Sequence, residues 1–331
     1  MMLLVHILPL VALCAGKAIP SIPGDNSDGD DRYFWIPDGN EEPQLVDSEE
    51  PVDFRYLATR NGSDNQYWLY TRNNPTTAQI LVHGDINSVS SSNYVATKPI
   101  MVICHGWRNS GKANVNKLVT NAALAAGDIN VIVLDWNKLA GKLNYYTAAA
   151  GVPEVGRYLG NFLIWLIKNA GGNWNNLHIV GHSLGAHVAG NAGRQTGGLP
   201  ARITGLDPAG HAWEDNADKL TNTDAVYVEA IHTDGARLGL NEAVGDADFY
   251  PNGGRNPQPG CLLYTCSHSR AYQLFASTIE NNGLVGKQCS SVKDANKGKN
   301  CNGPSLNMGN NILTKRGSGI YYLTTVKSYP Y

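Results

Sequence analysis

Short apolar runs alternate along the chain with longer segments in which apolar residues recur at helical spacing. The clearest helical segments are residues 112–126 and 153–169, the second with Pro153 at its start. The apolar runs are typical of strands, and they begin at Tyr67, Gln79, Pro99, Asn130, Leu177, Ile203, Val226 and Gly319. Buried strands that alternate with helices predict an α/β protein with a mainly parallel sheet, covered by helices on both faces.

The same pattern divides the chain into three parts. Residues 1–18 hold an apolar stretch followed by small residues, which is typical of a secretory signal peptide, although its start lacks basic residues. The alternative is a buried N-terminal helix. Residues 19–52 are rich in Asp, Glu, Pro and Gly and predict an acidic pro-segment or a flexible arm. Residues 53–331 predict one α/β domain. No later apolar run is long enough to span a bilayer, so we expect a secreted, extracellular protein.

Composition narrows the choice of partner. The chain has 331 residues, of which 42% are hydrophobic and 16% charged, values that fit a globular protein with a sizeable core. Its net charge of −2 and the lack of a Lys/Arg block give no electrostatic reason to expect a nucleic acid.

The cysteines are compatible with an oxidising compartment. Cys14 is expected to leave with the signal peptide. The simplest pairing of the rest is local, with Cys261 bonded to Cys266 and Cys289 bonded to Cys301. Cys104 ends an apolar run and is then a buried free thiol. Other connectivities remain open at this stage.

Residues 181–185 read GHSLG, the pattern G-x-S-x-G, and are the most informative segment of the chain. The mostly apolar run 177–180 precedes them, and a helix-compatible run of small residues, 184–190, follows. This strand, turn and helix predict a nucleophile elbow, in which Ser183 lies in a strained turn with its Oγ exposed. Glycines are needed there because side chains would collide with the neighbouring strand and helix. The alternative is an ordinary glycine-rich turn.

A serine nucleophile needs a base, and the base needs an orienting carboxylate, in the order Ser, acid, His in α/β-hydrolase-like folds. Asp207 is the best candidate acid because it ends the run 203–206, at the carboxyl edge of the next strand, where ligand chemistry gathers. The competing carboxylates are Asp234, Asp246 and Asp248. A helix cap or turn is the alternative role for Asp207.

Four histidines follow the elbow. His187 lies one turn along the elbow helix and is expected to face away from the serine, and His211 is awkwardly close in sequence to the acid. His232 lies inside an apolar strand, where a hydrogen-bonded core role is more frequent. We take His268 as the base, in a loop beside a cysteine and just before the helical run 269–279. An exposed loop histidine without a partner is the alternative.

The oxyanion needs two backbone N–H donors. In such an elbow the residue after the nucleophile, Leu184, supplies one of them. The second is expected from a loop after an earlier strand. Residues 105–107 read HGW and follow an apolar run, which favours the N–H of Trp107. A packed loop aromatic is the alternative, since the His-Gly pair also occurs at residues 83–84.

These segments together resemble the animal pancreatic-lipase family. The motifs GHSLGAH, ITGLDPAG, AIHTDG, DFYPNGG, QPGC and CSHSRA occur in this order, and HGW and VIVLDW fit as well. The resemblance covers roughly residues 54–326 and is greatest to secreted insect lipases and the phospholipase A1 branch. It implies an α/β-hydrolase fold with Ser183 as nucleophile, Asp207 as acid and His268 as base. It also implies that Trp107 and Leu184 donate to the oxyanion.

Departures from the family pattern carry information. In triglyceride lipases of the family, a long lid lies between the two cysteines that precede the histidine. Here that segment consists of Leu262, Leu263, Tyr264 and Thr265. Four residues cannot cover a catalytic cleft, so we expect an open site that admits bulky polar head groups.

Two other departures concern partners and metals. The chain ends before a C-terminal β-sandwich, so colipase is not expected. Residues 216–224 keep few of the carboxylates with which some members hold calcium, so no metal and no cofactor are expected.

The sequence thus predicts a secreted lipid carboxyl-ester hydrolase of phospholipase A1 type, which releases the sn-1 fatty acid through an acyl-enzyme. The alternatives are a lidless digestive triacylglycerol or galactolipid lipase and a non-catalytic lipid-binding protein of yolk type. The retained serine, acid and histidine argue against the last. We expect a monomer that acts on phospholipid or acylglycerol at a micelle or membrane surface. Asn61 begins the sequon NGS and is a predicted glycosylation site.

Overall fold

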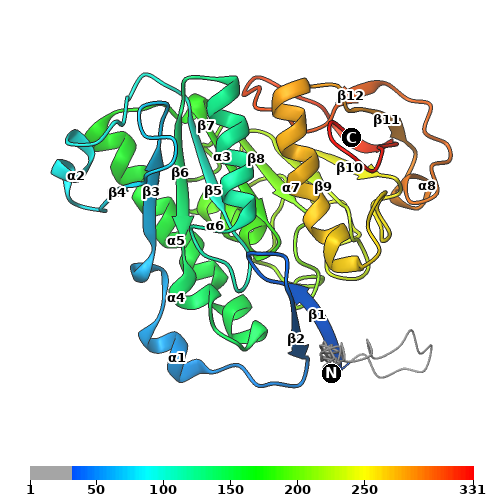
Figure 1. The fold of residues 1–331 in the computed structure, drawn as a ribbon, viewed down its shortest axis with the longest axis horizontal. Helices are drawn as coiled ribbons and strands as arrows, with labels where there is room; N and C mark the ends of the chain where they lie inside the picture. The colour runs from blue at the N-terminus through cyan, green and yellow to red at the C-terminus, as the bar shows by residue number, and fades with distance from the viewer. Residues whose placement is uncertain (1–31) are drawn as a thin grey trace, which may run out of the picture.

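One large sheet of eleven strands runs through residues 32–331, the part of the chain that the computed structural model describes (Figure 1). In order across the sheet the strands are β12 (Ser305–Asn307), β11 (Val285–Cys289), β13 (Gly319–Leu323), β10 (Ala247–Pro251), β9 (Val228–Ile231), β8 (Arg202–Leu206), β7 (Leu177–His182), β5 (Ile100–Cys104), β6 (Asn130–Asp135), β3 (Gln66–Tyr70) and β4 (Gln79–Leu81). The strands from β13 to β6 are parallel, and antiparallel pairs close both edges.

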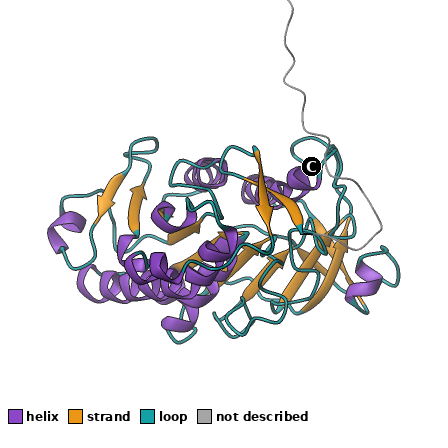
Figure 2. Ribbon diagram, turned by 90° about the horizontal axis from the view of Figure 1, so that it is seen from below, coloured by secondary structure: helices purple, strands orange, loops and turns teal. Residues whose placement is uncertain are grey.

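Helices cover both faces of this sheet, as Figure 2 shows. The pair α5 (Tyr145–Ala170) and α6 (Leu184–Gln195) lies on one face, and the pair α3 (Asn114–Ala126) and α7 (Tyr264–Asn281) on the other. Successive side chains of a strand point to opposite faces. Accordingly, Val102 and Cys104 of β5 belong to the core with α5 and α6, while Met101 and Ile103 belong to the core with α3 and α7. This architecture confirms the predicted fold class.

The remaining elements are short. They are α1 (Phe54–Thr59), α2 (Ile86–Ser90), α4 (Asn137–Ala140), α8 (Val292–Ala295) and the 3₁₀ helices Gly62–Asp64 and Trp174–Asn176. Within residues 32–331, no helix combines the length and the apolar character that crossing a bilayer requires.

Two predicted helices begin earlier than expected. Helix α5 starts at Tyr145, because the Asn144 side chain caps it by accepting a hydrogen bond from the Thr147 N–H at 2.8 Å, and Pro153 therefore lies inside the helix. Helix α7 starts at Tyr264 rather than at residue 269. Because α7 begins at Tyr264, His268 lies on this helix and not in the loop that the sequence predicts.

The N-terminal arm is ordered where the structure describes it. Strands β1 (Tyr33–Pro37) and β2 (Pro43–Asp47) form an antiparallel hairpin, so the flexible arm predicted for residues 19–52 is wrong from residue 32 onward. One hairpin face is apolar, and its Ile36 and Val46 are only 4% and 3% exposed. Burial of these side chains stabilises the hairpin in spite of its acidic neighbours. Figure 1 shows the hairpin at the edge of the sheet toward which the parallel strands point. The predicted signal peptide, residues 1–18, lies outside the described residues.

Two disulfides tie loops of the second half of the chain. Cys261 is bonded to Cys266 and Cys289 to Cys301, which is the local pairing that the sequence favours. Cys104 is a buried free thiol. Burial raises the pKa of this thiol, so it stays protonated and inert.

Candidate active site

Ser183 lies in a sharp turn between β7 and α6. Its backbone has φ 58° and ψ −126°, a conformation that costs a non-glycine residue about 1–3 kcal/mol. The flanking glycines allow the turn. A Cβ on Gly181 would lie 2.1 Å from the Gly185 carbonyl oxygen, and one on Gly185 would lie 2.1 Å from the Cys104 carbonyl oxygen. The chain therefore has the backbone geometry of a nucleophile elbow.

Asp207 and His268 form a buried pair beside this turn. The His268 Nδ1–H donates to Asp207 Oδ2 at 2.6 Å, and neither side chain is more than 1% exposed. The other carboxylate oxygen, Oδ1, accepts the backbone N–H groups of Thr233 at 2.7 Å and Asp234 at 3.0 Å. These donors hold the carboxylate in one orientation. Because Nδ1 donates its proton to the carboxylate, Nε2 of the neutral ring is left as a proton acceptor.

Contacts of the neighbouring residues bring the pair to the elbow. The His182 ring centroid lies 4.7 Å from that of His268, and the His182 Nε2–H donates to the His268 carbonyl at 3.2 Å. The Ser183 N–H donates to the Leu206 carbonyl at 3.1 Å, next to the acid. Burial, and secondly the charge of His268, lower the pKa of His182 well below its usual value, so His182 stays neutral. The pair of Asp207 and His268 therefore lies next to the elbow that carries Ser183.

The loop after β5 passes directly over the serine. A Cβ on Gly106 would lie 3.5 Å from Ser183 Oγ. The indole N–H of Trp107 donates to the Lys142 carbonyl at 2.8 Å, which holds this loop against the start of α5. Within residues 32–331 the backbone N–H groups of Trp107 and Leu184 donate to no protein acceptor. Both predicted oxyanion donors are therefore available to a ligand oxygen.

The other histidines after the elbow have their own contacts. The His187 Nε2–H donates to the Ala209 carbonyl at 2.9 Å, and burial lowers the pKa of His187 to about 3. His232 contacts the Leu240 carbonyl at 2.8 Å and Asp248 at 2.9 Å. The ring of His211 stacks on that of Phe34. These contacts leave His268 as the histidine paired with the candidate acid.

Two further residues, Asp234 and Gln258, support the pair. Asp234, which the sequence offers only as a competing acid, is fully buried and accepts the Leu238 N–H at 3.1 Å. Burial, and secondly the charge of Asp207, raise the pKa of Asp234, so it is neutral beside an ionised Asp207.

The second residue is the buried Gln258. Its side-chain amide donates to the Thr233 carbonyl at 3.2 Å, and its backbone N–H donates to Ser267 Oγ at 3.0 Å. It thereby links the residue before Asp234 to the residue before His268. In the sequence, the one signal for Gln258 is its position in the motif QPGC.

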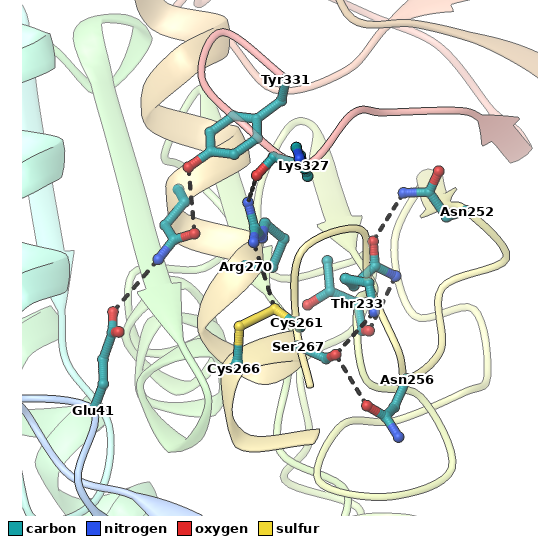
Figure 3. The surroundings of a disulfide bond; sticks show 12 residues. Glu41, Thr233, Asn252, Asn256, Cys261, Cys266, Ser267, Arg270, Lys327 and Tyr331 are labelled. Carbon is teal, nitrogen blue, oxygen red and sulfur yellow. Dashed lines mark hydrogen bonds between the residues drawn. A yellow bond between two sulfur atoms is a disulfide. The ribbon is translucent and has the colours of Figure 1, made fainter. Parts of the chain in front are cut away.

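The segment between Cys261 and Cys266 is short, and its last two residues, Tyr264 and Thr265, belong to the first turn of α7. Leu262 at its tip is 97% exposed. Figure 3 shows the disulfide at this end of the helix, with Arg270 between the Lys327 carbonyl, 3.3 Å away, and the sulfur of Cys261, 3.5 Å away. A segment of this length that is tied down at both ends leaves little chain to cover the site.

Two further predictions concern ligands of other kinds. Among the described residues, no group of three or more His, Cys, Asp and Glu side chains is arranged to hold a metal ion. Asn61 lies at the start of a 3₁₀ turn, where its Oδ1 accepts the Ser63 N–H at 2.9 Å. Its glycosylation stays a prediction.

The family model and the sequence relatives agree with the motifs. A family model described as Lipase matches residues 36–331. Lipase member H-B of Xenopus laevis is 39% identical over 249 residues, which cover 71% of this chain and 53% of that protein. Pancreatic triacylglycerol lipase of Homo sapiens is 34% identical over 264 residues, 71% of this chain and 56% of that protein. Among solved structures, an acetyl xylan esterase from Aspergillus awamori matches with a TM-score of 0.36 and 12% identity over 54% of this chain and 71% of that one. The chain spans about half the length of the two lipases.

Proposed function

This chain belongs to the lipase family that its motifs resemble, and on that premise we propose that it hydrolyses carboxylic esters of lipids through an acyl-enzyme on Ser183. The observation that carries the proposal is the buried 2.6 Å bond between His268 and Asp207 beside the strained serine turn. A hydroxyl group becomes a useful nucleophile near neutral pH only when such a base accepts its proton.

The steps follow from the roles of these groups. Ser183 Oγ attacks the ester carbonyl carbon while His268 Nε2 takes the hydroxyl proton, and Asp207 stabilises the resulting imidazolium. The carbonyl oxygen becomes an oxyanion and receives the N–H groups of Trp107 and Leu184. As the tetrahedral intermediate collapses, the imidazolium gives its proton to the leaving alcohol. Water then enters, loses a proton to His268 and releases the fatty acid by the reverse sequence.

Within this activity we propose a phospholipase A1-type enzyme that releases the sn-1 fatty acid. The short disulfide-bound segment at Leu262 supports this choice, since an uncovered site has room for a lipid with a bulky polar head. The second candidate is a triacylglycerol or galactolipid lipase, which the similarity to pancreatic triacylglycerol lipase supports. A secreted protein that acts at a micelle or membrane surface fits both, and the two disulfides favour an oxidising compartment.

The test compares fatty-acid release from phosphatidylcholine, a galactolipid and a triglyceride by the purified protein and by Ser183→Ala. We expect phosphatidylcholine to be cleaved at sn-1 and the variant to be inactive on all three substrates. Hydrolysis of the triglyceride alone would refute the phospholipase choice but keep the triad. Full activity of Ser183→Ala would refute the mechanism as a whole.

A further inference from the structure

An open cavity of about 620 Å³ is lined by the loop that follows Asp207 in sequence and by residues 236–237, and the ester-cleaving chemistry does not use it. Its two walls are residues 210–216, which follow the acid in sequence, and the turn at Ala236 and Arg237. The walls are joined at their base, where the Gly210 N–H donates to the Leu238 carbonyl at 2.7 Å. The cavity and the candidate acid therefore share the same loops.

The charged side chains of the two walls have opposite signs. Arg237 stands on one wall, and Glu214 and Asp215 stand on the other. All three are exposed, and within residues 32–331 none of them forms an ion pair. One cavity thus presents a free cation and two free anions that do not neutralise one another.

Both walls are held in place by the fold. The guanidinium carbon of Arg237 lies 4.8 Å from the centre of the Tyr264 ring, and the Tyr264 hydroxyl accepts the Trp35 N–H at 2.9 Å. On the other wall, the ring of Phe34 stacks on that of His211 at 3.8 Å. The N-terminal hairpin therefore supports both walls, through residues that the sequence places in an acidic pro-segment or a flexible arm. Such support from packed neighbours is what a binding site needs if its charged groups are to stay in position.

From this arrangement we propose that the cavity binds the head group of a zwitterionic glycerophospholipid. The phosphate lies at Arg237, whose planar guanidinium suits a phosphate geometrically, and the ammonium group lies at Glu214 and Asp215. The phosphate of such a lipid is one glycerol unit away from the ester, and the loops that line the cavity also surround the acid: Asp207 Oδ1 accepts the Asp234 N–H at 3.0 Å, and a Cβ on Gly239 would lie 2.5 Å from the same oxygen. The inference rests on the proposed lipid esterase and names the class of head group that this esterase accepts.

The first arm of the test measures kcat/KM on two soluble substrates, diheptanoylphosphatidylcholine and tributyrin. For Arg237→Gln we expect about a tenfold loss on the phospholipid, the value of one charge-assisted hydrogen bond, and a change of less than about twofold on tributyrin. Arg157→Gln is the matched control, because Arg157 is also an exposed arginine lying over a tyrosine ring, at 4.7 Å from that of Tyr158. It should leave both substrates unchanged. An equal loss on both substrates with Arg237→Gln, or no loss, overturns the head-group site.

The second arm tests the other wall by charge. The double variant Glu214→Gln/Asp215→Asn removes the partners of the ammonium group and also the repulsion toward anionic lipids. We expect kcat/KM to fall several-fold for diheptanoylphosphatidylcholine and to hold or rise for diheptanoylphosphatidylglycerol, which has no ammonium group. A parallel fall for both lipids overturns the proposed orientation.

The third arm does not depend on catalysis. Glycerophosphocholine, inorganic phosphate and choline are titrated separately into Ser183→Ala, alone and combined with Arg237→Gln. We expect glycerophosphocholine to bind more tightly than either fragment and to lose this advantage with Arg237→Gln. Binding without any ester hydrolysis by the wild type would refute the proposed function and keep the site. Hydrolysis of esters without binding of glycerophosphocholine would refute the site and keep the function.

Discussion

Asp207→Asn separates the role of the acid in holding His268 from its role in the fold. Because Oδ1 accepts two backbone N–H groups, at 2.7 and 3.0 Å, the amide oxygen of the asparagine must occupy that place. The amide NH₂ then takes the position of Oδ2, 2.6 Å from Nδ1 of the histidine, and as a donor it forces the proton onto Nε2. A ring protonated at Nε2 cannot accept the serine proton. The expected loss in kcat is about 10⁴-fold, or about 5.4 kcal/mol of transition-state stabilisation.

The assay is the hydrolysis of p-nitrophenyl butyrate, which needs no lipid surface. Asp248→Asn is the control, since Asp248 is also a buried carboxylate that bonds a histidine, at 2.9 Å to His232, and accepts two backbone N–H groups, those of Val244 and Gly245. It should lower the free energy of unfolding by about 1–3 kcal/mol and leave kcat nearly unchanged. If Asp207→Asn, folded by circular dichroism, kept kcat within about tenfold of the wild type, the assigned tautomer and with it the triad would be wrong.

Three other predictions follow from single contacts. Burial lowers the pKa of His187 to about 3 in the folded chain, against about 6.5 in the unfolded chain. Below pH 6.5 the unfolded chain therefore binds more protons than the folded one. The free energy of unfolding then falls with the pH, by up to about 1.4 kcal/mol per pH unit. His187→Gln should flatten this slope in urea titrations between pH 5 and 7.5, and an unchanged slope would contradict the assignment. Tyr264→Phe removes the acceptor of the Trp35 N–H and should lower the free energy of unfolding by about 1 kcal/mol. Hydrogen exchange in residues 33–47 should become faster. Unaltered exchange would mean that other contacts hold the hairpin. Gly239→Ala would put a Cβ 2.5 Å from Asp207 Oδ1 and should reduce ester hydrolysis at least tenfold, a prediction that a fully active variant would overturn.

The elbow and its strands were predictable because their signals are local. Residues 177–190 combine an apolar run, two glycines in contact with neighbouring backbone and a run of small residues, and each of these constrains the chain within a few positions. Asp207 follows from the same rule, since a parallel strand delivers its carboxyl end to a known edge of the sheet. The roles of Ser183, Asp207 and His268 came from the family resemblance as much as from these local signals.

Helix boundaries were less predictable because caps override periodicity. The Asn144 side chain starts α5 eight residues before the proline that the pattern favours as its first residue. Helix α7 begins inside the segment enclosed by the disulfide, so His268 sits on a rigid helix instead of a loop. The N–H groups of Thr233 and Asp234 hold the carboxylate that His268 contacts, and Gln258 bonds the Thr233 carbonyl. Polar contacts of this kind depend on tertiary proximity and leave no periodic trace in the sequence.

The N-terminal hairpin shows how composition misleads when contacts are distant. Residues 19–52 have the acidic, proline-rich composition of a disordered segment, yet Trp35 bonds Tyr264, a residue 229 positions further along the chain. An arm of that composition folds when it finds an apolar surface to cover, and here that surface borders the catalytic edge of the sheet. Through Tyr264 and His211 the hairpin supports the cationic and the anionic wall of the cavity at once. Removing the hairpin should therefore alter head-group preference before it alters ester cleavage, because the backbone N–H groups of Thr233 and Asp234 hold Asp207, and the Ser183 N–H is bonded to the Leu206 carbonyl in the sheet.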